Sequence, residues 1–297
     1  MRGWGLARHE ACPIACSLQV RTRLQEGHCS TILGMNTKRV GIAGREFVVH
    51  GDPGDRYFRD GIRDGRGHVE LPIAVAQRFC DSEAMIVDVG ANIGLSSLAF
   101  AHIARNGQVL AFEPSPRNFA LLSSNVAANE VRNVEIVQVA LSDREGFLTM
   151  IEDVEFMAGS HVEAAGSVPA TGHCIEIPAT TLDREQRKRS LRRLDLLKID
   201  VEGHERQVID GARETLDRFR PICVFEFNSY FMVYKLGVSP RRFLDEMFGI
   251  FPLLYYFDRR SGRLQDLRNR EDVFLQHNRE GGFVDDLVGA FHELPGD

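Results

Sequence analysis

The chain of 297 residues is poor in several features that mark particular classes of protein. It has six cysteines, and none of them falls into the paired Cys-x-x-Cys sets of a zinc site. They are also too dispersed for a disulfide framework, which favours a reducing, cytoplasmic environment. No apolar run approaches the roughly 20 residues that span a bilayer, so we expect no membrane-spanning helix.

Positive charge and tryptophan are scarce as well. The formal net charge is -6, and there is one tryptophan. A nucleic-acid-binding surface needs a basic face with interleaved aromatic side chains, so we expect no nucleic-acid partner. The 43% of apolar and 26% of charged residues are ordinary for a globular enzyme.

Three segments are predicted from the pattern along the chain. Residues 1–34 have no apolar period and no signal peptide, and we expect a weakly ordered extension there, with Met35 as a possible true start. Residues 35–80 are expected to form a cap, with a hairpin over 39–49 and a helix over 69–79. Residues 81–297 form the main, Rossmann-like domain in this prediction.

The main domain alternates strand and helix signals, which predicts an α/β fold with a mostly parallel sheet and helices on both faces. Residues 146–177 are less regular and suggest at most an edge hairpin. The expected strands are 85–89, 108–112, 134–139, 194–199, 222–227, 253–257 and 273–276, and the expected helices are 95–104, 116–129, 205–219 and 240–248.

A glycine-rich turn follows the first of these strands. Gly90 and Gly94 permit a tight bend and the close approach of a ligand at the strand ends. A dinucleotide-binding turn has a further glycine where Asn92 stands. Asp88 at the strand end suits a cationic ligand and repels a pyrophosphate. The turn therefore favours S-adenosylmethionine (SAM) over NAD, and a ligand-free turn is the plain alternative.

Further polar residues end the next two strands. Glu113 lies about 20 residues after the turn, where a carboxylate accepts hydrogen bonds from both ribose hydroxyls. Ser142 and Asp143 follow the third strand, where they are candidates for contacting the adenine amino group. An exposed acid and an ordinary turn are the alternatives for these two positions.

In this order, the motifs resemble those of the FkbM family of SAM-dependent methyltransferases. The resemblance covers about residues 68–230. It implies a class I methyltransferase fold with a seven-stranded sheet, one strand of which is antiparallel, and O-methylation of sugars, glycolipids or secondary metabolites. The similar segments are residues 87–94, 112–114, 140–143, 180–183, 197–205 and 224–227.

A second charged cluster is expected at the end of the fourth strand. Strand alternation places Lys198 and Asp200 on one face, with Glu202 at the tip. His204 is the leading candidate for the base because imidazole titrates near neutral pH, although it is equally suited to start the next helix. Asp200 and Glu202 are also oxygen ligands for Mg²⁺, but no third ligand is evident, so no metal is predicted.

The fifth strand contributes the remaining candidates. Glu226 and Asn228 are expected at the same edge, in the acceptor pocket. Tyr230, Phe231 and Tyr234 follow, and such aromatic side chains either cover an acceptor or pack in the core.

The sequence thus predicts SAM-dependent O-methylation of a small-molecule or glycan acceptor. A methyltransferase acting on protein or nucleic acid, a catalytically silent SAM-binding module and an NAD-dependent oxidoreductase are the alternatives. The sequence leaves the acceptor and the oligomeric state open.

Overall fold

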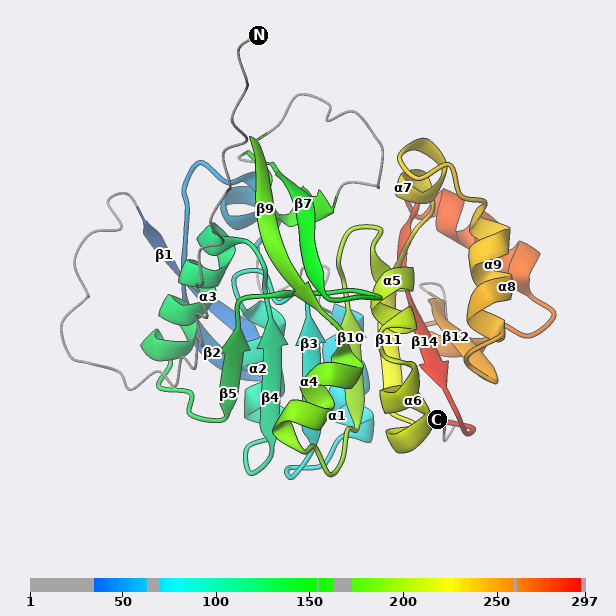
Figure 1. The fold of residues 1–297 in the computed structure, drawn as a ribbon, viewed down its shortest axis with the longest axis horizontal. Coiled ribbons are helices and arrows are strands. Elements are labelled where there is room, and N and C mark those ends of the chain that lie inside the picture. Colours follow the sequence, from blue (N-terminus) through cyan, green and yellow to red (C-terminus); the bar gives the residue numbers. More distant parts are fainter. Residues whose placement is uncertain (1–34, 63–69, 154, 163–172, 259–260, 295–297) are drawn as a thin grey trace, which may run out of the picture. The chain divides into compact units, whose positions relative to one another are not determined.

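An eight-stranded sheet organises the part of the chain that the computed structural model describes, which is residues 35–62, 70–153, 155–162, 173–258 and 261–294 (Figure 1). Five strands run parallel, and all but the edge strand are largely buried among apolar side chains. In chain order they are β3 (Met85–Val89), β4 (Gln108–Phe112), β5 (Val134–Val137), β10 (Leu196–Ile199) and β11 (Ile222–Asn228).

Three further strands complete one side of the sheet, in the order β13-β12-β14-β11-β10-β3-β4-β5. β14 (Val284–Ala290) pairs antiparallel with β11, β12 (Leu253–Asp258) with β14, and β13 (Arg263–Asp266) with β12. The α/β prediction is confirmed, but the sheet has eight strands rather than seven, and two of them oppose the parallel set. The additional edge strand arises because Gly262, at φ +68°, turns the chain back along β12.

Helices cover both faces of the sheet, as predicted. α1 (Glu70–Phe79) and α2 (Leu95–Ile103) pack with the N-terminal hairpin in one apolar core. The opposite core takes side chains from α4 (Leu182–Arg189), α5 (Glu205–Asp210), α6 (Arg213–Phe219), α8 (Pro240–Phe248) and α9 (Glu271–Glu280). α3 (Pro116–Ala128) begins at the N-cap Ser115, and α7 (Ser229–Tyr234) follows β11 directly.

Two of the expected elements are wrong in detail. The helix expected over 205–219 is interrupted at Gly211, where a Cβ atom would lie 1.9 Å from the carbonyl oxygen of Ser142. The strand expected over 273–276 lies inside α9, in which Phe274 and Asn278, four residues apart, are both buried. The true last strand, β14, was not expected.

A second, four-stranded sheet draws strands from the segment 146–177, for which the sequence pattern predicts at most an edge hairpin. Its order is β6-β9-β7-β8, from β6 (Ala140–Leu141), β7 (Gly146–Glu152), β8 (His161–Val162) and β9 (His173–Thr180). In Figure 1, β7 and β9 rise beyond the ends to which the parallel strands point. This small sheet therefore supplies a wall over the edge where ligands bind in open α/β sheets.

The predicted N-terminal hairpin is present as β1 (Asn36–Ile42) and β2 (Arg45–Gly51), and a short π-helix, η1 (Tyr57–Gly61), follows it. Phe47 and Val49 are buried in the same core as α1 and α2. The boundary expected at residue 80 stays a prediction. The extension expected over 1–34 lies outside the described residues. Among the residues that are described, no helix is long and apolar enough to cross a membrane.

Candidate active site

A pocket of about 220 Å³ lies at the carboxyl ends of β3, β4, β10 and β11. Parallel register brings these ends to one edge, so residues far apart in sequence meet there. β6, β7, β8 and η1 supply further lining side chains. Eight of the twelve predicted site residues line the pocket, namely Gly90, Asn92, Glu113, Lys198, Asp200, Glu202, His204 and Glu226.

The glycine-rich turn forms the floor of the pocket next to β3. Gly90 has φ +73°, and a Cβ atom there would lie 1.8 Å from the carbonyl oxygen of Asp200. The backbone of Asp200, at the end of the neighbouring strand β10, therefore excludes any side chain at position 90. Gly94, at φ +97°, is the N-cap of α2 and packs on Leu122 outside the pocket lining. Asn92 also has positive φ, and its Oδ1 atom is buried without a hydrogen-bond partner among the described residues.

Asp88 is not among the residues that line the pocket, and its contact with the cofactor stays a prediction. Its carboxylate is fully buried and accepts hydrogen bonds from Ser96 Oγ at 2.7 Å and Ser97 Oγ at 2.6 Å. Its other oxygen lies 3.2 Å from Lys198 Nζ. Asp88 therefore fixes the start of α2 and the lysine of the central strand.

Lys198 is a buried cation that joins the two central strand ends. Its Nζ donates to the carbonyl oxygen of Gly90 at 2.8 Å and lies 3.4 Å from Asp200 Oδ2. Burial alone lowers the pKa of Lys198, but the carboxylates of Asp88 and Asp200 outweigh it and raise that pKa. Lys198 therefore stays charged and orients Asp200.

Glu113 is held rigidly at the end of β4, and its side chain is 4% exposed. One carboxylate oxygen accepts from the backbone N–H of Asn92 at 2.8 Å and the other from that of Ser115 at 2.9 Å. Burial raises the pKa of Glu113 to about 7, and the two N–H donors limit the shift. Each oxygen keeps a lone pair for a ligand hydroxyl.

His204 lines the pocket from the turn that precedes α5. Its Nε2 lies 2.9 Å from Ser142 Oγ, and that hydroxyl donates to Asp143 Oδ1 at 3.1 Å. Burial lowers the pKa of His204 to about 4, which corrects the expectation that it titrates near neutral pH. Ser142 and Asp143 lie outside the pocket lining; Ser142 contacts the imidazole and Asp143 contacts Ser142. Their predicted contact with the cofactor stays a prediction.

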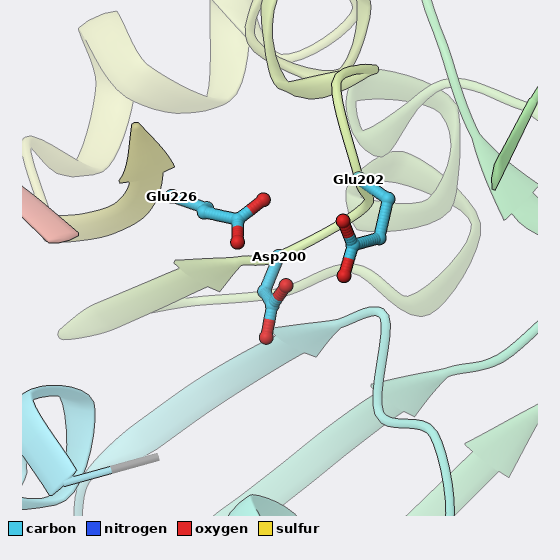
Figure 2. A group of neighbouring side chains, drawn as sticks. All are labelled: Asp200, Glu202 and Glu226. Atoms are coloured by element: carbon cyan, nitrogen blue, oxygen red, sulfur yellow. The ribbon is translucent and has the colours of Figure 1, made fainter. Parts of the chain in front are cut away.

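Three carboxyl groups converge on the acceptor side of the pocket, as Figure 2 shows. Asp200 follows β10, Glu202 lies in the next turn, and Glu226 lies near the end of β11. Each offers an oxygen, and these oxygens all lie within 4.8 Å of one another. Burial, together with the neighbouring acids, raises the pKa of Glu202 and of Glu226 well above the ordinary value. The sequence placed these acids at one edge, but it did not identify them as one cluster.

Sequence reasoning missed the side of the pocket that the small sheet and η1 form. Tyr57, Phe156 and His161 line it. So does Asn118, whose Oδ1 is buried and lacks a hydrogen-bond partner within the described ranges. For Asn118, the one local signal was its place as a polar residue just after the N-cap Ser115. Tyr57, Phe156 and His161 reach the pocket through contacts that are distant in sequence.

The predicted aromatic residues after β11 take different places. The ring of Phe231 packs edge to face on His161, with centroids 5.0 Å apart. Tyr230 and Tyr234 are 53% and 72% exposed, and their rings lie 4.7 Å apart. Asn228, two residues before Tyr230, lines the pocket, whereas Tyr230 and Tyr234 do not.

Comparison with known proteins identifies the family. Residues 88–256, more than half of the chain, match the model of the methyltransferase FkbM domain. The chain belongs to this family of methyltransferases, as the resemblance of its motifs indicated.

Individual relatives share part of the chain. It is 34% identical over 157 residues to 31-O-demethyl-FK506 methyltransferase FkbM of Streptomyces tacrolimicus, spanning 44% of this chain and 60% of that protein. It is 26% identical over 216 residues to 2-O-methyltransferase NoeI of Sinorhizobium fredii, spanning 69% of this chain and 87% of that protein. A solved structure of methyltransferase FkbM from Methylobacillus flagellatus aligns with a TM-score of 0.43 at 15% identity, over 70% of this chain and 44% of that chain.

Proposed function

We propose that this chain is a SAM-dependent O-methyltransferase acting on a hydroxyl of a sugar, glycolipid or secondary metabolite. The observation that carries the proposal is the meeting of a rigid ribose acceptor, Glu113, and an acidic edge, Asp200 with Glu202, in one pocket. Membership of the FkbM methyltransferase family supports the reaction class. The names of the relatives above, two O-methyltransferases, support oxygen as the acceptor atom.

The chemistry of the pocket fits SAM on three counts. Glu113 has acceptor capacity for the ribose hydroxyls. The buried Oδ1 atoms of Asn92 and Asn118 lack partners within the described residues and suit the hydroxyl and amino groups of the cofactor. The acids beyond Lys198 give the pocket a negative side that is favourable for a sulfonium cation.

The residues of the chain have defined tasks once donor and acceptor are bound. SAM supplies a methyl group on positively charged sulfur. Asp200 and Glu202 hold the acceptor hydroxyl in line with that methyl group, and Lys198 fixes Asp200. The hydroxyl oxygen forms the new bond to carbon while the carbon–sulfur electron pair stays on sulfur.

The hydroxyl proton needs an acceptor, and His204 is the leading candidate. The imidazole is neutral at pH 7, which is the form that takes up a proton, although burial, which lowers the pKa of His204 to about 4, also weakens it as a base. Ser142 fixes the ring through Nε2. Glu202, or Glu226 on the neighbouring strand β11, is the next candidate.

Tyr230 and Tyr234, which are exposed and follow the pocket-lining Asn228 in sequence, are proposed to contact the acceptor. Tyrosine rings stack on apolar or sugar surfaces while their hydroxyls stay in water. We expect Tyr234→Ala to raise KM for the acceptor and to leave SAM affinity unchanged. Val233→Ala, which changes an exposed neighbour on the same helix, is the matched control.

The test is transfer of a labelled methyl group from SAM to a panel of sugars and hydroxylated metabolites, with the product analysed for a new O-methyl group. Asp200→Asn should reduce turnover by about 10²–10⁴-fold, the range for loss of a positioned polar or proton-transfer group, and should change SAM affinity little. Loss of SAM binding in Asp200→Asn would instead place this residue in the cofactor site. SAM binding without transfer to any hydroxyl would contradict O-methylation.

A further inference from the structure

The three carboxyl groups at the acceptor edge come from two strand ends and one strained turn. Glu202 has φ +52° and Gly203 has φ +92°, so the backbone turns sharply after Asp200. The Glu205 carboxylate accepts from the backbone N–H groups of Val201 at 3.1 Å and Gly203 at 3.2 Å and thereby fixes this turn. Glu205 is committed to the backbone, whereas the side chain of Glu202 faces Asp200 and Glu226 (Figure 2).

Nearby positive charge does not balance this cluster. Lys198 Nζ lies 3.4 Å from Asp200 Oδ2, but it is shared with Asp88 at 3.2 Å. Glu226 is 7% exposed, and its Oε2 has no hydrogen-bond partner among the residues that the structure describes. A buried carboxylate oxygen without a donor is costly, and its neighbours in the cluster are other acids.

Hard divalent cations match this set of donors. Mg²⁺ and Mn²⁺ prefer carboxylate oxygens, and at a metal–oxygen distance of about 2.1 Å opposite ligands lie about 4.2 Å apart. The oxygens of Asp200, Glu202 and Glu226 lie within 4.8 Å of one another, so small side-chain rotations bring them to that spacing. No histidine or cysteine belongs to the group, which disfavours zinc and copper.

We propose that Asp200, Glu202 and Glu226 form a binding site for a divalent cation of the Mg²⁺ or Mn²⁺ type. All three line the pocket, and three protein ligands leave coordination positions open on the pocket side. Within the proposed function, those positions take an acceptor hydroxyl or a vicinal diol. Such a site selects acceptors with oxygen donors at the reacting position.

The direct test is a titration of the metal-depleted full chain with Mn²⁺ alone, without SAM, followed by the electron paramagnetic resonance signal of free Mn²⁺. We expect one saturable site per chain. Glu226→Gln and Asp200→Asn should each weaken binding at least tenfold. Glu46→Gln, which removes an exposed acid of β2, is the matched control and should bind as the unaltered chain does.

Thermal unfolding gives a second readout. Glu226 is buried and its Oε2 has no hydrogen-bond partner among the described residues, so the metal-free Glu226→Gln variant should be as stable as the unaltered chain or more so. Mn²⁺ should raise the melting temperature of the unaltered chain and not that of the variant. If Glu226→Gln does not fold, Asp200→Asn provides the same comparison.

The outcomes separate this proposal from the proposed function. An unaltered chain that binds SAM in calorimetry but shows no saturable Mn²⁺ binding overturns the metal site and leaves methyl transfer intact. Mn²⁺ binding that persists equally in both variants also overturns it. A chain that binds Mn²⁺ at these residues but does not bind SAM supports the metal site and contradicts the methyltransferase.

Discussion

At the scale of single residues, Glu113 is the position at which cofactor binding is most sensitive to a substitution. Its two oxygens are already oriented by backbone N–H groups, so a ligand hydroxyl meets an acceptor that needs no reorganisation. Above pH 8, where the Glu113 carboxyl is mostly ionised, we expect Glu113→Ala to weaken SAM binding by about 1.5–3 kcal/mol, the value of a charge-assisted hydrogen bond. Calorimetric titration measures this loss, with Glu46→Ala as the control. An unchanged dissociation constant would remove Glu113 from the cofactor site.

Gly90 shows how a residue of the cofactor turn is constrained by the protein itself. Its Cβ position coincides with the carbonyl oxygen of Asp200, and its φ of +73° disfavours other residues. We expect Gly90→Ala to lower the free energy of unfolding by about 3 kcal/mol or more, because the two strand ends must separate. Gly41→Ala is the control, since nothing lies within 4 Å of that Cβ position. Equal urea midpoints for the two variants would contradict the steric argument.

At the scale of elements, two asparagines of α3 and its C-cap bind the N-terminal hairpin to the main sheet. Asn125 accepts from the N–H of His50 at 2.6 Å and donates to the carbonyl oxygens of His50 at 3.1 Å and Ile93 at 2.8 Å. Asn129 repeats the arrangement at Val48, accepting at 2.8 Å and donating at 2.7 Å. The side-chain amides thus replace a neighbouring strand along the edge of β2.

Asn125→Ala should therefore be strongly destabilising. The substitution leaves one buried N–H and two carbonyl oxygens without partners, each costing about 1–3 kcal/mol. Some of that cost is relieved by water, so we expect a loss of about 2–4 kcal/mol in denaturant unfolding. Asn106→Ala, at an exposed loop position, should cost little. A loss below 1 kcal/mol for Asn125→Ala would show that the hairpin is held by apolar contacts alone.

The elements that the sequence predicts correctly are those with a local signal. β4 and α8 have the predicted bounds because an apolar run and a helix-starting proline define them without tertiary contacts. The run at 273–276 is ambiguous between strand and helix, and the acids Glu271 and Asp272 before it were the local sign of a helix start. The break at Gly211 depends on the backbone of Ser142, which is distant in sequence, so no local pattern predicts it.

The residues of the candidate site were also predictable only where a local signal marks them. Glu113 and the acids after β10 were predictable because parallel strands end at one edge. The cluster with Glu226 was not, since side-chain convergence depends on the left-handed turn at Glu202. The contacts of Asp88 with Lys198 and of Ser142 with His204 were not predictable, because they join residues that are distant in sequence.

At the scale of the whole molecule, the buried Glu113 makes stability depend on pH. Its pKa is raised from 4.5 to about 7 on folding, so the folded state binds this proton more strongly than the unfolded state. The resulting stabilisation is fully present below about pH 4.5 and is lost as pH rises through about 7. The pKa of Glu113 differs by about 2.5 between the folded and the unfolded chain, which corresponds to a stabilisation of about 3 kcal/mol.

Glu113→Gln isolates this contribution. Relative to the variant, we expect the unaltered chain to lose about 2.5 kcal/mol of unfolding free energy between pH 5 and pH 8. Urea denaturation at several pH values measures it. A difference that does not vary with pH would show that Glu113 remains ionised throughout.

The central claim is that SAM binds at the carboxyl ends of β3, β4 and β10, with its ribose at Glu113. A crystal structure of the chain soaked with S-adenosylhomocysteine tests it most directly. We predict the ribose hydroxyls within hydrogen-bond distance of the Glu113 carboxylate. A ligand bound elsewhere, or a pocket that stays empty at saturating ligand, would contradict the claim.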